Sequence, residues 1–226
     1  MSIETGLSEV KARLSAALKA AGRAEGDARL IAVSKTFPAE CAAEAYRCGQ
    51  RAFGENRVQE LSEKAPKLPT DVEWHLIGHL QQNKVRMALE HAAWIHSIDS
   101  LALLQRTVRI AGELGVTPKL LLEVNISGEE SKFGLTPSDV PSVLEGCPTP
   151  MLAGFMTVAP LGASEEELHR IFGDLRKLRD EMEAASGLRL PELSMGMSGD
   201  FEIAIAEGAT MVRVGTAIFG HRDYTI

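Results

Sequence analysis

Short apolar segments alternate with helix-like stretches from about residue 29 onward, and this alternation restricts the possible folds more than any other feature. The segments are rich in β-branched residues and end in Gly, Asn, Asp or Ser, which is typical of strands in βαβ units. We predict strands at residues 30–35, 51–56, 73–79, 93–99, 119–126, 151–159, 191–196 and 211–220. The pattern therefore indicates a parallel sheet whose strands are joined by helices.

Helices are predicted between these strands at residues 38–48, 57–65, 83–90, 101–114, 137–144, 164–185 and 201–207. Ser164 and Glu167 form a capping box at the start of the sixth of these, and Gly187 is a typical C-terminal stop. No helix is predicted after the last strand. A further amphipathic helix over residues 3–21 precedes the first strand, and we expect it to cover the face left bare.

Eight strands with eight helices in 226 residues favour a (β/α)8 TIM barrel with an additional N-terminal helix. We expect residues 1–226 to form one domain, because no linker or composition change divides the chain. The alternative is an open doubly wound sheet. It is less favoured, since such a sheet has two edges and no candidate strand carries the charges that protect an edge.

Composition narrows the function classes. The formal net charge of −7 argues against broad binding to nucleic acid, although a local pocket can still be positive. The sequence start lacks an apolar signal core and no apolar run approaches the roughly 20 residues of a membrane span, so we expect an unexported protein without membrane association. Three cysteines without a close pair fit a reducing cytoplasm.

The active or binding site of a barrel lies at the carboxyl ends of its strands, and Lys35 ends the first predicted strand. Strand alternation places this lysine on the same face as Ile31 and Val33. Partial removal from water would favour the neutral amine, which is a nucleophile. A lysine that simply reaches solvent at a strand end is the alternative, and taken alone it is the more frequent situation.

The last two strands lead into segments rich in glycine and hydroxyl groups, LSMGMSGD at 193–200 and VRVGTA at 212–217. Glycines allow close backbone approach, and hydroxyls with free N–H groups at the start of a short helix bind phosphate. Barrels commonly build a phosphate site after strands seven and eight. An ordinary turn is the alternative for a loop of this composition.

Arg213 lies within an apolar strand, on the same face as Gly215. A buried arginine needs a partner, either a carboxylate such as Glu55 or Glu123 on a neighbouring strand or an acceptor on a ligand. The residues alone leave both possibilities open.

A nucleophilic lysine, a phosphate cradle and an arginine able to meet a ring nitrogen together describe a site for pyridoxal 5'-phosphate (PLP). At these residues the sequence resembles the pyridoxal phosphate homeostasis protein family, which is related to the amino-terminal barrel of alanine racemase. The matching segments are AVSKTFP at 32–38, FGENRVQE at 53–60, WHLIGHLQQNK at 74–84, EVNISGEESKFG at 123–134, GFMTVAP at 154–160, LSMGMSGDFEIAIAEGAT at 193–210 and VRVGTAIFG at 212–220.

The resemblance implies that Lys35 forms the internal aldimine and that Arg213 faces the pyridine nitrogen. It also implies that the phosphate is held by Ser198, Gly215 and Thr216. The remaining pocket lining would come from Asn56, His79 and Met195. The family is regarded as a cofactor carrier or buffer without established turnover. We therefore expect a non-catalytic, monomeric PLP-binding protein, with PLP-dependent apo-enzymes as possible recipients of the cofactor.

An amino acid racemase is the alternative function, but racemisation needs a second acid–base group opposite the lysine. In alanine racemase this group is a tyrosine from an additional domain of the partner subunit, whereas this chain contains only Tyr46 and Tyr224. A cation beside the ring nitrogen also weakens the ring as an electron sink. A sugar-phosphate aldolase that uses Lys35 would share the lysine and the phosphate site but leaves Arg213 unexplained.

His75 and His79 fall on one face of the third predicted strand, a spacing that could hold a metal ion. No cysteine or carboxylate cluster with ligand spacing accompanies them, so we expect no metal site.

Overall fold

A computed structural model describes residues 2–129 and 132–220, and in these residues eight parallel strands occur in chain order. The strands are β1 (Arg29–Val33), β2 (Ala52–Glu55), β3 (Glu73–Leu76), β4 (Trp94–Ile98), β5 (Lys119–Glu123), β6 (Leu152–Met156), β7 (Glu192–Ser194) and β8 (Met211–Val214). Each predicted strand is present, but all eight end earlier than predicted, because the residues that follow them leave the sheet.

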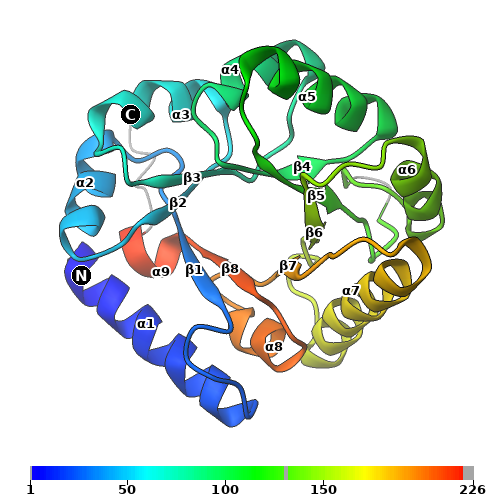
Figure 1. Cartoon of the computed structure of the whole chain (residues 1–226). Coiled ribbons are helices and arrows are strands. Elements are labelled where there is room, and N and C mark those ends of the chain that lie inside the picture. Colours follow the sequence, from blue (N-terminus) through cyan, green and yellow to red (C-terminus); the bar gives the residue numbers. More distant parts are fainter. Residues whose placement is uncertain (1, 130–131, 221–226) are drawn as a thin grey trace.

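The strands close into a barrel in which β1 pairs with both β2 and β8 (Figure 1). Ala32 lies opposite Phe53 in one pairing, and Ile31 lies opposite Arg213 in the other. Since every strand has two neighbours, no unpaired edge is left to protect. The predicted (β/α)8 barrel is confirmed and the open sheet is excluded.

Helices surround the barrel, and most of them match the predicted ranges closely (Figure 1). They are α1 (Ile3–Ala20), α2 (Ala39–Arg47), α3 (Val58–Lys64), α4 (Val85–Leu89), α5 (Leu101–Leu114), α6 (Val140–Gly146), α7 (Glu165–Ser186), α8 (Phe201–Ala206) and α9 (Thr216–Phe219). Both predicted ends of α7 are confirmed. Ser164 and Glu167 form the capping box, and Gly187 ends the helix at a φ of 69°.

The predicted strand over residues 211–220 is wrong in its second half. β8 ends at Val214, and the amides of Ile218 and Phe219 both donate to the Gly215 carbonyl to form α9. The expectation that no helix follows the last strand is therefore wrong as well. A run of four apolar or small residues has no periodicity that separates strand from helix.

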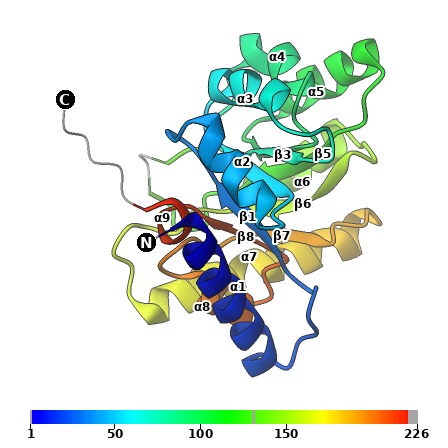
Figure 2. The same ribbon diagram turned by 90° about the vertical axis from the view of Figure 1, so that its left-hand side faces the viewer.

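The N-terminal helix α1 packs against α8 and α9 on the outside of the barrel (Figure 2). Its buried residues Leu7, Val10, Leu14 and Leu18 recur every three or four positions, which places them on one face. The predicted covering role of this helix is thus confirmed, although the surface it covers includes α9.

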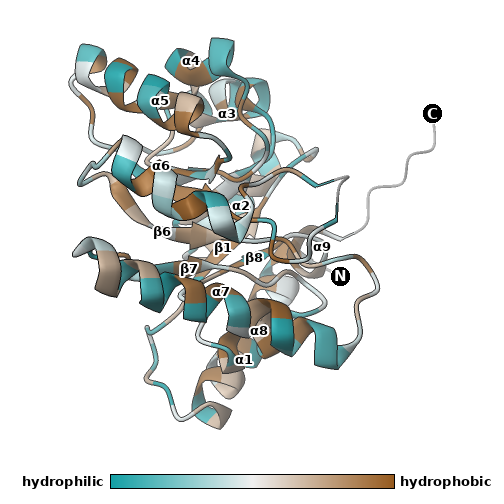
Figure 3. Cartoon of the chain, turned by 90° about the vertical axis from the view of Figure 1, so that its right-hand side faces the viewer, coloured by the Kyte–Doolittle hydropathy of each residue, from teal (hydrophilic) through white to brown (hydrophobic). Residues whose placement is uncertain are grey.

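The core has two layers, because successive side chains of each strand point to opposite faces. One small cluster fills the inside of the barrel, with Ile31, Trp94, Leu121, Ala153, Met156 and Met211. The larger cluster lies between the strands and the helices, whose apolar sides face inward (Figure 3).

Three further expectations concern membrane spans, cysteines and metal sites. Among the described residues, no helix combines the length and apolarity needed to cross a membrane. The cysteines Cys41, Cys48 and Cys147 are free and half-buried. The same described ranges contain no cluster of three or more His, Cys, Asp or Glu side chains suited to a metal ion.

Candidate functional site

A pocket of about 340 Å³ opens at the carboxyl ends of the strands, where barrels place their sites. It is lined by Val33, Lys35, Asn56, Ile77, Val158, Met197, Ser198, Gly199, Arg213, Gly215 and Thr216. Six of the eight residues predicted for the site are thus brought together. The other two, His79 and Met195, do not line this pocket.

The lining residues give the pocket a positive and hydrogen-bond-donating character. Lys35 and Arg213 are cations, and no Asp or Glu lines the pocket among residues 2–129 and 132–220. This contrasts with the formal net charge of −7 for the whole chain. The other lining side chains divide between apolar groups and polar groups that can donate hydrogen bonds. The pocket therefore suits an anionic ligand with an apolar body.

Lys35 lies in a turn two residues after the end of β1 and is exposed. The expected desolvation of Lys35 is therefore wrong, because β1 ends at Val33, although Val33 and Lys35 still line the same pocket. The turn is closed by a hydrogen bond of 3.1 Å from the Phe37 amide to the Ser34 carbonyl. Its position at the barrel mouth still directs Lys35 into the pocket lining.

Asn56 follows β2, and the loop after β3 packs directly against its backbone. A Cβ atom at Gly78 would lie 2.3 Å from the Asn56 carbonyl oxygen, a distance that no other residue could tolerate. Gly78 therefore allows the close approach of two loops that fixes Asn56 at the pocket wall.

The loops after β7 and β8 meet at Ser198 and Gly215, where the Gly215 amide donates to the Ser198 hydroxyl at 3.3 Å. The Asp200 carboxylate accepts from the Met197 amide at 2.5 Å and orders the first of these loops. A Cβ atom at Gly215 would come within 3.1 Å of the Val33 carbonyl oxygen. The predicted phosphate loops therefore lie against the end of β1, beside Lys35.

Arg213 is 4% exposed and points into the barrel, where Nη1 donates to the Ser194 hydroxyl at 2.7 Å and Nη2 to the Thr157 carbonyl at 2.9 Å. These bonds use two of its five N–H groups. Burial lowers the pKa of Arg213 to about 10, against the attraction of Glu123 and Asp200. At this value the guanidinium stays charged at neutral pH.

The carboxylates proposed from the sequence as partners of Arg213 are engaged differently. Glu55 faces the outside of the barrel and pairs with Lys64 at 2.7 Å, so it is not the partner of Arg213. Glu123 acts on Arg213 through charge, while the hydrogen bonds of Arg213 go to Ser194 and Thr157.

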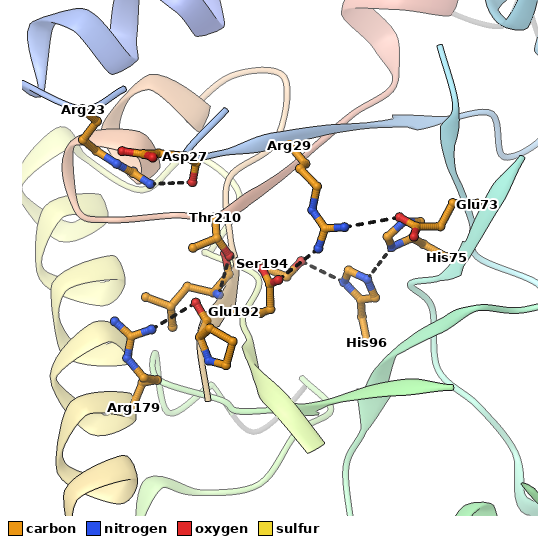
Figure 4. A network of polar contacts seen from close by, with 12 residues as sticks. Arg23, Asp27, Arg29, Glu73, His75, His96, Arg179, Glu192, Ser194 and Thr210 are labelled. Atoms are coloured by element: carbon orange, nitrogen blue, oxygen red, sulfur yellow. Dashed lines mark hydrogen bonds and ion pairs between the residues drawn. The ribbon is translucent and has the colours of Figure 1, made fainter. Parts of the chain in front are cut away.

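A buried chain of hydrogen bonds continues from Ser194 through the barrel to its opposite end (Figure 4). Ser194 Oγ lies 2.8 Å from His96 Nδ1, His96 Nε2 lies 2.9 Å from His75 Nδ1, and His75 Nε2 lies 3.0 Å from the Glu73 carboxylate. Glu73 in turn pairs with Arg29, which also contacts Glu192. The chain joins the pocket to the amino-terminal ends of the strands.

The Glu73 end of this chain and the burial of both imidazoles, which favours their neutral form, set its direction. The Ser194 hydroxyl accepts from the Arg213 guanidinium, which can only donate, and its own O–H is available to donate to His96 Nδ1. The Glu73 carboxylate can only accept, so His75 Nε2 carries a proton. Both imidazoles are then neutral, with the proton on Nε2.

The pKa shifts agree with this direction. Burial lowers the pKa of His75 and holds that of His96 well below its usual value. The hydrogen bond from His75 is the largest cause that lowers the pKa of Glu73 to about 2. Aligned neutral dipoles thus connect the buried Arg213 cation to a carboxylate that remains charged.

His79 stands at the mouth of the barrel beside the pocket instead of inside it. Its Nδ1 lies 3.0 Å from the Asp99 carboxylate, and its ring stacks on Phe133 at a centroid distance of 4.1 Å. Glu123 is near this group, and burial together with repulsion from Asp99 raises the pKa of Glu123 to about 7. The mouth therefore carries a carboxyl group that ionises near neutral pH.

Met195 is fully buried in the layer between the strands and the helices. Ser194 points into the barrel, so the alternation of β7 directs Met195 outward. The methionine that lines the pocket is Met197, which the sequence analysis missed. Carrying the alternation one residue past Ser194 assigns Met195 to the outer layer. It does not find Met197, which reaches the pocket because it lies in the loop after β7 ends at Ser194.

Neither Tyr46 nor Tyr224, the two candidate acid–base tyrosines, is among the described residues that line the pocket. The Tyr46 hydroxyl donates to Asp71 at 2.7 Å on the outside of the barrel, and Tyr224 lies outside the described residues.

Comparisons with known proteins extend over most of the chain. Residues 7–223 match the model of the family described as "Alanine racemase, N-terminal domain". The "Pyridoxal phosphate homeostasis protein" of Aquifex aeolicus is 43% identical over 222 residues, which cover 96% of this chain and 97% of the relative.

Two solved structures place the fold among known barrels. PipY of Synechococcus elongatus PCC7942, solved with PLP bound, is 43% identical with a TM-score of 0.86, covering 97% of this chain and 100% of that one. An alanine racemase of Clostridium difficile 630 has a TM-score of 0.77 at 16% identity, covering 99% of this chain and 58% of the racemase. The second similarity concerns the fold alone.

Proposed function

Because this chain belongs to the alanine racemase N-terminal domain family and, within it, to the pyridoxal phosphate homeostasis proteins, we propose that it binds PLP and serves as a carrier or buffer of this cofactor. The observation that carries the proposal is the pocket lining in an acidic protein: the part of it that the structure describes combines two cations and several donors with no carboxylate. PipY, whose structure contains PLP, supports the same ligand.

The residues present fit PLP group by group. The Lys35 amine can attach the aldehyde covalently, and the Ser198 and Thr216 hydroxyls with the Gly215 backbone can hold the phosphate. Arg213 has N–H groups left to meet the ring nitrogen, and Asn56 adds a polar contact at the wall. Val33, Ile77, Val158 and Met197 supply apolar surface for the ring.

When bound, PLP supplies an aldehyde that reacts with amines and a ring that withdraws electrons from the attached carbon. Arg213 limits the second property, because a permanent cation opposes protonation of the ring nitrogen. Its hydrogen bonds to Ser194 and Thr157 hold the guanidinium in place inside the barrel. The pocket is therefore better suited to retaining the cofactor than to carbanion chemistry.

Racemisation of amino acids remains the alternative, and it needs acid–base groups on both faces of the substrate carbon. Within the described pocket lining, Lys35 is the residue whose side chain can take up and release a proton in this way. Glu123, whose pKa of about 7 would suit such a role, lines a neighbouring cavity with Lys132 and Phe133. We propose that the protein is not an enzyme.

The proposal further includes one domain over residues 1–226, a monomeric state, a cytoplasmic location and transfer of PLP to apo-enzymes. We propose no nucleic-acid or membrane partner, which the formal net charge of −7 supports.

Cofactor transfer and turnover can be measured side by side to test this function. The purified protein loaded with PLP should restore activity to a PLP-dependent apo-enzyme, while racemase and transaminase assays over the common amino acids show no robust turnover. Turnover that disappears in the Lys35→Ala variant would overturn the carrier function, and a loaded protein without visible absorbance would overturn PLP binding itself.

The phosphate position gives a separate prediction. Loss of a charge-assisted hydrogen bond costs about 1.5–3 kcal/mol, so Ser198→Ala should weaken the binding of PLP by roughly 10- to 100-fold. Binding of pyridoxal, which lacks the phosphate, should change little. Equilibrium titration of both ligands measures the difference, and equal weakening of the two would mean that the phosphate binds elsewhere.

A further inference from the structure

The turn that carries Lys35 adopts a backbone conformation that its sequence does not favour. Lys35 and Thr36 are the central residues between Ser34 and Phe37, and Thr36 has a φ of 68°. Thr36 is the one non-glycine residue with a positive φ in residues 2–129 and 132–220. A β-branched residue is strained in this left-handed region, so contacts from elsewhere must hold the turn.

Two side chains of helix α3 hold the backbone on either side of Lys35. The Lys64 amine donates to the Ser34 carbonyl at 2.8 Å, and the Thr36 amide donates to the Glu60 carboxylate at 2.6 Å. Glu60 and Lys64 are one helical turn apart and 3.5 Å from each other. The helix thus contacts both peptide groups that flank the lysine.

A third residue anchors this pair to the sheet. Glu55 at the end of β2 is fully buried, accepts from the Lys64 amine at 2.7 Å and accepts from the Ser34 hydroxyl at 2.6 Å. The side chain of Lys64 is 8% exposed and that of Glu60 is 21% exposed. We call Glu55, Glu60 and Lys64 the α3 clamp; none of the three lines the pocket.

We propose that the α3 clamp positions Lys35, with Glu60 as the residue that holds Thr36 in its left-handed conformation. The inference rests on the proposed function, in which the Lys35 amine attaches PLP. Without the clamp, Thr36 relaxes to negative φ and the amine leaves its direction toward the pocket. A misdirected nucleophile slows the attachment, because a displacement of about 1 Å can cost as much as 100-fold in rate.

The Glu60→Ala variant tests the role of Glu60 in the clamp. Stopped-flow absorbance measures the rate at which PLP attaches covalently to Lys35. In this variant the rate should fall by about 10- to 100-fold. Glu63→Ala on the same helix is the matched control, since Glu63 is exposed and should attach PLP at the wild-type rate. Glu60→Gln keeps an acceptor for the Thr36 amide and should restore most of the rate.

A second substitution separates positioning from general stabilisation. Glycine adopts a φ of 68° without strain, so a glycine at position 36 makes the contact with Glu60 unnecessary. The double variant Glu60→Ala/Thr36→Gly should therefore attach PLP faster than Glu60→Ala alone. If the double variant is no faster, or if Glu60→Ala attaches PLP at the wild-type rate, the proposal is wrong.

Hydrogen exchange of the Thr36 amide can be measured on the wild-type protein without PLP. It therefore does not depend on whether any variant folds. In the ligand-free wild-type protein this amide should exchange slowly, because Glu60 accepts its hydrogen at 2.6 Å. Rapid exchange would overturn the clamp. If the wild-type protein does not attach PLP at Lys35, the proposed function is wrong. The exchange rate of the Thr36 amide would then still show whether Glu60 holds the turn.

Discussion

The Lys35→Ala variant is expected to carry no covalently attached PLP. Attachment requires an uncharged amine close to the aldehyde, and Lys35 is the lysine that lines the pocket with Ser198 and Arg213. Borohydride reduction followed by peptide mass spectrometry measures the result directly. In the wild-type protein the reduced pyridoxyl group should appear on Lys35.

Lys84→Ala provides the matched control, because Lys84 lies outside the pocket lining, in the short helical turn before α4. This variant should keep the full amount of attached cofactor. A pyridoxyl group found chiefly on Lys84 or Lys132 of the wild-type protein would contradict the assignment of Lys35.

The Lys64→Met variant should lower the free energy of unfolding by about 3–5 kcal/mol, the cost typical of removing one partner from a buried ion pair. The physical reason is that the fully buried carboxyl group of Glu55 would lose its ion-pair partner, the Lys64 amine 2.7 Å away. Burial already raises the pKa of Glu55 above its usual range, although hydrogen bonds from Lys64 and Ser34 oppose the shift. Urea denaturation of the cofactor-free protein measures the loss.

The double variant Lys64→Met/Glu55→Leu should recover part of this loss, since it leaves no buried charge. Recovery should be incomplete because the Ser34 carbonyl also loses its bond from Lys64. Lys67→Met serves as the control, as Lys67 is exposed and its replacement should change stability by less than about 0.5 kcal/mol. An equal loss for Lys64→Met and Lys67→Met would show that the buried pair contributes little.

The barrel could be predicted because its determinants are local. Each strand is a short apolar run between turn residues, and the long amphipathic helices α5 and α7 carry their own periodicity and caps. The prediction is wrong at Thr216–Phe219, because four residues are too few to show either the helical or the strand periodicity. In the structure this segment packs against helix α1, a contact that is remote in sequence and that a local pattern does not show.

The site was predictable where a residue's place follows from a strand end, as for Arg213, or from a glycine-rich loop, as for Ser198 and Gly215. The prediction for Met195 is wrong because the preceding residue, Ser194, points into the barrel, so Met195 points outward into the layer beneath the helices. The exposure of Lys35 depends on where β1 ends, and strand ends are set by packing and not by the alternation itself.

The polar networks were beyond prediction, because their members lie far apart in sequence. Ser194 meets His96 across 98 positions, and the single-residue bulge in the pairing of β4 with β5 alters which side chains enter the barrel. The pairing of Glu55 with Lys64 spans only nine positions. Even so, a sequence does not reveal that both side chains are buried, and it leaves Glu55 as a candidate partner of Arg213.

Because β1 pairs with β8, a newly made chain can hold its cofactor only after the last strand has been synthesised. Translation delivers Lys35 early and Gly215 late, yet these residues face each other only after the last strand has docked beside the first. A growing chain on the ribosome therefore displays the lysine long before it has a phosphate cradle. Because a ligand that binds only the folded state stabilises that state, PLP would selectively protect finished molecules from proteolysis and leave incomplete ones unprotected.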